Sequence, residues 1–367
     1  MRTFSGANWV AAGFVAAAVI CVSPAFASAD TRVVHPGQSI QAAVNASEPG
    51  DTVVVKAGTY YQSVSIVTDG ITLRAHGQVT LKPSKYGYGE CYLSGNAVGI
   101  CVASSEFVPG TSSNAERISD VTITGFRIEG FEGDGVFGFG TENLTVSDVV
   151  AVNNTAYGVA SFEGIGTKFL RNSATGSHDA GIYVGDSHDA NALVKNNRAW
   201  GNALGILVRN VQNAIVSDNH AWGNCIGVFL LADGQEGGSG HIAVLNNTVV
   251  GNNEVCTQFF EGGFLPVLGG GGIVLAGSQH NVVFQNVVRD NEAETGEETI
   301  FSGGIVLVET PRARSDGSKD DSSNNLVFLN RARGNDPADI VKDDASTPNL
   351  IIANVCRTSQ PTGLCGF

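Results

Sequence analysis

A repeated unit of about two dozen residues constrains the fold of this chain more than any other feature. The unit reads N-x-[AV]-x-[GD]-N followed by G-[IV]-x-[VL], and its clearest copies are NNRAWGNALGILV at 196–208 and DNHAWGNCIGVFL at 218–230. The first asparagine recurs without interruption at Asn172, Asn197 and Asn219. Self-similarity at such a period is the signature of a solenoid or a related repeat architecture.

Each unit carries two asparagines at fixed positions, separated by strand-like runs of three or four residues. Such runs cannot bury a face alone, so each must stack on its copy in the next unit. Stacked asparagines then form a ladder in which side-chain amides bond one another, while asparagine itself tolerates a left-handed corner. Leucine-rich and calcium-binding nonapeptide patterns do not occur. The pattern predicts an all-β, single-stranded right-handed parallel β-helix of about ten coils. The ladder positions are Asn172, Asn197, Asn219, Asn247, Asn286, Asn330 and Asn354, and then Asn154, Asn202, Asn224, Asn252, Asn291 and Asn335.

The first 29 residues have the composition of a secretory signal peptide. Arg2 precedes an apolar run at 9–22, and small residues at 25–29 supply a cleavage site. The run is about 14 residues long, shorter than the ~20 residues that span a bilayer, and no later segment reads as a membrane span. We therefore expect residues 30–367 to form one secreted, extracellular domain.

An open solenoid end exposes sheet edges and core, so both ends of the rod need a cap. Ser39 followed by helix formers predicts a short capping helix within an N-terminal cap at about 30–50. Four segments interrupt the period and are expected to be loops on one side of the rod. These insertions are 86–117, 234–272, 292–303 and 309–325. The outward residues of the G-[IV]-x-[VL] strand are apolar, and we expect aromatic and leucine side chains of the second insertion to cover them. The expected covering residues are Phe259, Phe260, Phe264 and Leu265.

The net charge of −14 argues against a protein that coats nucleic acid or an anionic membrane. Six cysteines follow the signal peptide, and an even number in an oxidising compartment indicates disulfides. Among the 15 possible connectivities we expect the local one, 91–101, 225–256 and 356–365. No C-x-x-C motif indicates zinc. The loop Ser315–Asp321 could hold Ca²⁺, but it lacks EF-hand spacing, which favours a solvated acidic loop, and no other cofactor is indicated.

The opening HPGQSIQAAVNASEPGDTVVVKAGTY at 35–60 and the later N-x-A-x-G-N-x-x-G-I units resemble a known superfamily. This is the NosD-type, pectate-lyase-like parallel β-helix superfamily of carbohydrate-binding proteins and sugar hydrolases. The resemblance covers nearly all of the chain after Ala29, and it implies this fold and a carbohydrate ligand. The superfamily includes pectate and alginate lyases, uronan epimerases, glycoside hydrolases and non-catalytic accessory proteins, and fold alone does not choose among them.

Threading the unit in phase points its asparagine and alanine inward and its intervening residues outward. Trp200 and Trp222 then stack on an outer face beside Arg198 and His220. Stacked indoles suit the C–H surface of a sugar ring, and residues 190–217 contain basic residues but no acidic ones, which suits an anionic polymer. Trp–Trp and Trp–Arg stacks also stabilise coils without any ligand, so this alternative stays open.

Cleavage of a uronan by β-elimination, or its C5 epimerisation, needs a base for the C5 proton and a cation for the carboxylate. Lys195 or His220 could be the base, and Arg198 or Arg171 could face the carboxylate. The predicted substrate-binding residues are Trp200, Trp222, Arg171 and Asp218.

Asp134 and Asp179 form a second candidate constellation. Threading gives them equivalent phase two coils apart, roughly 10 Å, which is near the upper limit for an inverting glycosidase. Polygalacturonase-type hydrolases carry N-T-D, D-D and G-H-G in consecutive coils, whereas here Ala156-Tyr157 replaces D-D and no G-H-G follows. Corner carboxylates that bond local amides are the alternative.

The leading hypothesis is a monomeric extracellular β-helix protein that binds an acidic polysaccharide, with β-elimination or C5 epimerisation left open. The first alternative is a non-catalytic accessory scaffold. The second alternative is an inverting glycoside hydrolase that uses Asp134 and Asp179.

Overall fold

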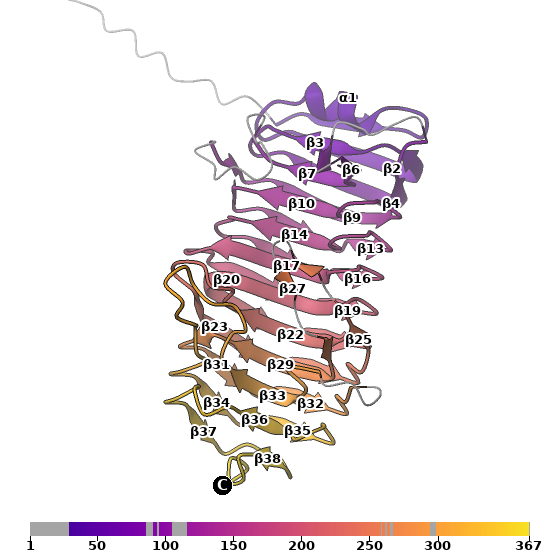
Figure 1. The fold of residues 1–367 in the computed structure, drawn as a ribbon. Helices are drawn as coiled ribbons and strands as arrows, with labels where there is room; N and C mark the ends of the chain where they lie inside the picture. Colours follow the sequence, from indigo (N-terminus) through magenta and orange to yellow (C-terminus); the bar gives the residue numbers. More distant parts are fainter. Residues whose placement is uncertain are drawn as a thin grey trace, which may run out of the picture.

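A computed structural model describes residues 29–85, 91–93, 95–104, 116–257, 259–260, 263–264, 267–293 and 299–366. Its strands wind into a parallel β-helix, and Figure 1 shows the coils stacked along one axis from the N-terminal to the C-terminal end. The long sheet pairs each strand with its counterpart one coil later, as the repeat predicts. The expected fold class is therefore confirmed.

The coils build three stacks of parallel strands, which we call the first, second and third stacks in chain order. The first stack contains β1 (Thr31–Val34), β12 (Thr145–Ser147), β15 (Lys168–Leu170), β18 (Ala192–Lys195), β23 (Ser239–Leu245), β30 (Ser278–Gln279), β31 (Val282–Phe284), β34 (Leu326–Phe328) and β37 (Leu350–Ile352). The second contains β13 (Val150–Val152), β16 (Ser173–Thr175), β19 (Arg198–Trp200), β21 (His220–Trp222), β24 (Thr248–Val250), β32 (Val287–Arg289) and β35 (Arg331–Arg333). The third contains β3 (Val64–Ile66), β7 (Ile100–Val102), β10 (Val136–Phe139), β14 (Val159–Phe162), β17 (Ala180–Ser187), β22 (Ile226–Leu231), β29 (Gly271–Ala276), β33 (Gly303–Val308), β36 (Ile340–Lys342) and β38 (Ser359–Gln360).

Longer strands bridge two stacks, and short elements decorate the rod. The bridging strands are β2 (Thr52–Tyr61), β4 (Thr72–Lys82), β9 (Thr122–Glu129) and β20 (Leu204–Ser217). The short elements are α1 (Ile40–Asn45), β5 (Tyr92–Leu93), β6 (Asn96–Ala97), β8 (Ile118–Ser119), β11 (Thr141–Glu142), β25 (Val255–Cys256), β26 (Phe259–Phe260), β27 (Gly263–Phe264) and β28 (Leu268–Gly269). Helix α1 begins where the sequence indicates, because Ser39 accepts a hydrogen bond from the N–H of Ala42. None of the helices within the described ranges has the length and apolar content required to cross a bilayer.

Two buried asparagine ladders hold the coils in register, as predicted. The Nδ2 and the backbone N–H of Asn197 both donate to Oδ1 of Asn219, at 3.0 and 2.9 Å. The left-handed corner belongs to the residue before the ladder asparagine rather than to that asparagine: φ is 58° at Asn196 and 57° at Asp218. Placing the corner on the ladder asparagine was therefore wrong, because that side chain must point inward to reach the next coil.

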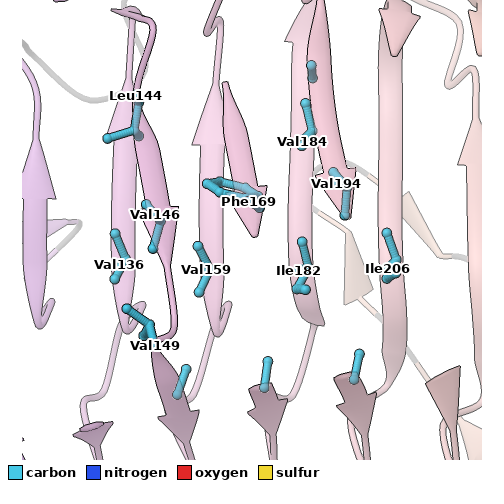
Figure 2. Close-up of a cluster of buried hydrophobic side chains, with 14 of the residues drawn as sticks. Val136, Leu144, Val146, Val149, Val159, Phe169, Ile182, Val184, Val194 and Ile206 are labelled. Atoms are coloured by element: carbon cyan, nitrogen blue, oxygen red, sulfur yellow. The ribbon is translucent and has the colours of Figure 1, made fainter. Parts of the chain in front are cut away.

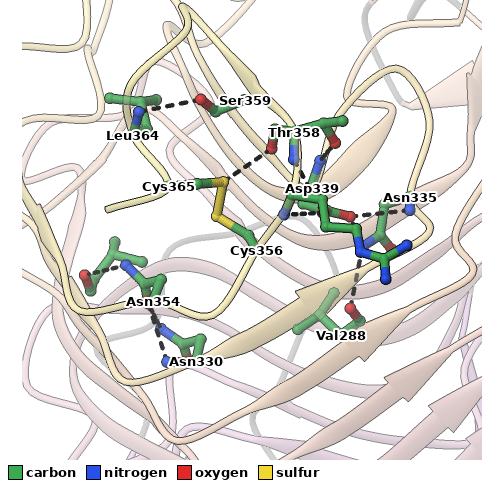
Figure 3. The surroundings of a disulfide bond; sticks show 12 residues. Val288, Asn330, Asn335, Asp339, Asn354, Cys356, Thr358, Ser359, Leu364 and Cys365 are labelled. Atoms are coloured by element: carbon green, nitrogen blue, oxygen red, sulfur yellow. Dashed lines mark hydrogen bonds between the residues drawn. A yellow bond between two sulfur atoms is a disulfide. The ribbon is translucent and has the colours of Figure 1, made fainter. Parts of the chain in front are cut away.

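One rung of the second ladder lacks its asparagine. Ser177 occupies the position, since its N–H donates to Oδ1 of Asn202 at 3.0 Å. Its hydroxyl is buried and has no hydrogen-bond partner. At the other end, the ladder stops on Asp339, whose Oδ1 accepts from the Nδ2 of Asn335 at 3.0 Å (Figure 3).

Aliphatic columns fill the interior of the rod. Figure 2 shows Val136, Val159, Ile182 and Ile206 of successive third-stack strands, and all four side chains are buried. Such columns follow from strand alternation, because every second residue of each short strand points inward. The interior is thus built from matching positions of consecutive units.

A second apolar cluster lies on the outer side of the third stack, as the outward apolar residues predict. Tyr183, Leu207 and Phe229 belong to this cluster and are buried. Phe301 of the third insertion contacts Phe229 with ring centroids 5.3 Å apart. The covering residues expected at Phe259, Phe260, Phe264 and Leu265 lie outside the described side chains.

All three expected disulfides form: Cys91–Cys101, Cys225–Cys256 and Cys356–Cys365. Figure 3 shows the last of them beside Asp339 at the C-terminal end of the rod. The central disulfide attaches β25 of the second insertion to the start of β22.

Candidate functional site

The two tryptophans stack on the outer face of the second stack. Trp200 of β19 and Trp222 of β21 are paired in register, with ring centroids 5.0 Å apart and planes only 4° from parallel. Both indoles are half-buried, because Ala199 and Ala221 take the inward positions between the outward side chains. The predicted aromatic platform is therefore present in the described fold.

Basic side chains continue along the same face. Arg198 pairs in register with His220, and the tryptophan column continues through Val250 to Arg289. The next coil adds Arg331 and Arg333 on β35. We name this surface the Trp–Arg face; it consists of Arg198, Trp200, His220, Trp222, Arg289, Arg331 and Arg333.

The cations of the Trp–Arg face are largely uncompensated by the protein itself. Among the described residues, Arg198, Arg331 and Arg333 form no salt bridge, and all three are exposed. Arg289 lies 2.7 Å from Asp290, but both side chains are more than half exposed, so water screens this pair. On a chain of charge −14, this is a local site for anions.

His220 is held in its neutral form. Its ring centroid lies 4.3 Å from that of Trp222. Partial burial lowers the pKa of His220, and the positive charges of Arg198 and Arg289 lower that pKa further. A neutral imidazole at neutral pH can accept a proton, which is what a general base requires.

Lys195 and Asp218 sit at the border between the first and second stacks and pair with each other, Nζ to Oδ2, at 3.4 Å. Arg171 lies one coil earlier and is engaged by Asp148 through two hydrogen bonds of 2.9 and 2.7 Å. Sequence reasoning missed Asp148, although it stands one unit before Arg171 at the same corner position. The structure thus offers Arg198 rather than Arg171 as the unpaired cation.

Asp134 and Asp179 are not in equivalent phase, which corrects the sequence-based threading. The strand register Val136↔Val159↔Ile182 places Asp134 level with Tyr157, and Asp179 one residue out of step. The extra residue between Asp179 and its strand causes the offset. Threading by the acidic residues alone had missed it.

Both carboxyls of this second constellation are shielded from water. Burial raises the pKa of Asp134 to about 7, although its Oδ1 accepts the N–H of Tyr157 at 2.9 Å. Burial also raises the pKa of Asp179 to about 6, with a hydrogen bond from the Tyr157 side chain opposing this rise. Asp134 is only 3% exposed, so its carboxyl serves the local amide rather than an open cleft.

Sequence reasoning also missed a buried charged network at the ends of the third-stack strands. Arg209 donates to Asp233 at 2.6 Å, and Asn210 donates to both Asp233 and Asp186, at 2.6 and 3.0 Å. Arg312 of the fourth insertion reaches the same Asp233 at 3.3 Å. The only sequence signal is the alignment of strand ends in successive units. This network attaches an insertion to the coils.

The carboxylates of the acidic loop are occupied locally. Asp316 accepts from Ser318, Asp321 accepts from Gln279, and Asp320 pairs with Arg314. Across the described part of the chain, no three His, Cys, Asp or Glu side chains gather as a metal site would require.

Comparison with known proteins agrees with this architecture. A family model described as "Right handed beta helix region" matches residues 168–319. The mannuronan C-5 epimerase AlgE4 A-module of Azotobacter vinelandii is similar with a TM-score of 0.59 and 20% identity, over 88% of this chain and 91% of that chain. The periplasmic alginate epimerase AlgG gives 0.57 at 14% identity, over 89% and 83%. The Dettilon tailspike protein gives 0.51 at 12% identity, over 89% and 68%.

The chain is therefore a right-handed parallel β-helix protein with the fold of the pectate-lyase-like superfamily. At these identities the likeness to the solved structures concerns the fold alone. Among curated proteins, none matches the sequence.

Proposed function

We propose that this protein is exported and binds an acidic polysaccharide along the Trp–Arg face. The observation that carries the proposal is the coplanar Trp200–Trp222 stack flanked by unpaired arginines on an otherwise acidic protein. Indole faces attract the C–H surfaces of sugar rings, while exposed guanidinium groups attract carboxylates. The epimerase names of two structures that share this fold add support for a uronan as the ligand.

We further propose that His220 removes the C5 proton of a bound uronate. Its lowered pKa keeps the imbalance toward the neutral base at neutral pH. Arg198 and Arg289, which lower that pKa, would also neutralise the substrate carboxylate as charge develops on it. Return of a proton from the other side of the sugar gives epimerisation, whereas departure of the C4 oxygen substituent gives β-elimination. Both outcomes begin with the same proton transfer.

Binding is tested with polygalacturonate and polymannuronate in a titration calorimeter. The double substitution Trp200→Ala with Trp222→Ala should weaken affinity by about tenfold or more, since 1.4 kcal/mol corresponds to tenfold. Phe284→Ala with Phe328→Ala is a matched control, because these rings also stack, 4.5 Å apart, but on the first stack. Equal affinity of the tryptophan variant and the native protein would refute the proposed binding face.

Proton transfer is tested by incubating the polymer with the protein in deuterated water. Deuterium should enter at C5, observed by NMR, and His220→Gln should abolish this exchange while polymer binding persists. Binding without any exchange would instead identify a non-catalytic accessory protein, which is the alternative that the sequence leaves open.

A further inference from the structure

A pocket of about 670 Å³ lies beside the tryptophans, at the corner where the second stack passes into the third. Glycines of three consecutive coils line it on the side of the rod. The segment from Glu254 to Thr257 lines the opposite side, and the Cys225–Cys256 disulfide fixes that segment to the coil. The volume lies in the range of small-ligand pockets.

The glycines leave this space open without any demand from the backbone. Asn153 and Asp290 adopt the same left-handed conformation at this corner in other coils, with φ of 52° and 57°. A Cβ added at Gly201 or Gly223 would meet no atom closer than 3.4 Å. Side chains are therefore tolerated at the corner, and their absence here is what admits a ligand.

The pocket continues the aromatic platform. Trp200 and Trp222 each directly precede a glycine that lines the pocket, Gly201 and Gly223. A sugar unit stacked on the indoles therefore has its neighbouring unit directed to the pocket. The two places are parts of one binding surface.

Charge separates the two parts. Arg198, His220 and Arg289 lie on the tryptophan side, whereas no lysine or arginine lines the pocket and Glu254 does. A uronate carboxylate is attracted to the first part and repelled from the second. An uncharged sugar unit meets no such repulsion, and its hydroxyls can bond the side chains of His178 and Thr257.

We propose that this pocket takes an uncharged sugar unit adjacent to the bound uronate. The natural ligand is then an acidic heteropolysaccharide, in which charged and uncharged units neighbour one another, rather than a uronate homopolymer. The inference rests on the proposed function of the Trp–Arg face and specifies its ligand class.

The test compares hyaluronan, in which uronate alternates with an uncharged amino sugar, with polygalacturonate, which contains uronate alone. Native protein should bind hyaluronan more tightly, and Gly223→Asn should weaken hyaluronan binding about tenfold while leaving polygalacturonate binding unchanged. Gly251→Asn is the matched control: it has the same left-handed φ of 59°, lies one coil further and does not line the pocket. Thermal denaturation checks that both variants fold.

Three outcomes overturn the pocket assignment. If Gly223→Asn affects both polymers equally or neither, the pocket is not a separate subsite. If it affects neither while loss of both tryptophans still weakens binding, the Trp–Arg face stands and the pocket assignment alone fails. If the native protein binds neither polymer, both proposals fail together.

Discussion

The substitution Asp134→Asn should make the protein more stable at alkaline pH and remove part of its pH dependence. The carboxyl is buried at 3% exposure, and its pKa rises from 3.8 to about 7 chiefly through loss of hydration. An amide of the same shape keeps an oxygen that accepts the N–H of Tyr157. It has no charge to bury, so the variant keeps the hydrogen bond without the electrostatic cost.

The sign and size follow from proton linkage. The folded state raises the pKa of Asp134, so the protonated form is favoured in the folded state and stability falls as pH rises through about 7. With each pKa unit corresponding to about 1.4 kcal/mol, this group alone lowers the free energy of unfolding by about 3 kcal/mol between pH 5 and pH 8. Asp179 acts in the same direction and remains in the variant.

The assay is urea denaturation of the native protein and the variant at pH 5 and pH 8. The variant should gain stability over the native protein by about 3 kcal/mol more at pH 8 than at pH 5. Glu132→Gln serves as control, because Glu132 is exposed two residues away and should leave the difference unchanged. An Asp134→Asn protein with the pH dependence of the native chain would refute the argument from burial.

Three further predictions concern the ladders and the site. Ser177→Asn should complete the second ladder between Asn154 and Asn202 and raise the free energy of unfolding by about 1 kcal/mol, measured by denaturant titration; a lower value would mean that the rung has no room for the amide. Asn219→Ala should lower it by about 3 kcal/mol, because buried donors of the preceding coil lose their acceptor, and an unchanged midpoint would contradict the ladder's role. C5 exchange by the native protein should persist below the ordinary histidine pKa of about 6.5, because the pKa of His220 is lowered; a midpoint above that value would exclude His220 as the base.

Sequence alone predicted the register of the coils because chemically distinctive residues mark it. Asn197 and Asn219 are too polar to be buried without each other, so their spacing sets which residues become neighbours. The same periodicity placed Trp200 over Trp222 and pointed both outward. The pairing of the six cysteines followed from their closeness in the sequence.

Other features depend on geometry that the repeat does not specify. The offset between Asp134 and Asp179 arises from one extra residue outside the repeated motif, where no ladder residue marks the phase. The pairing of Arg171 with Asp148 depends on side-chain reach across coils. The ion pair between Arg312 and Asp233 joins segments 79 residues apart, so only the folded chain reveals it.

The spine of asparagines passes undisturbed through coils of very different length. Consecutive rungs are 22 residues apart from Asn197 to Asn219, yet 39 apart from Asn247 to Asn286 and 44 from Asn286 to Asn330. Extra polypeptide is therefore accommodated outside the spine, and segments can be lengthened, shortened or exchanged there without altering how neighbouring turns bond. Such a scaffold lets recognition diversify between descendants while heat resistance is inherited largely unchanged.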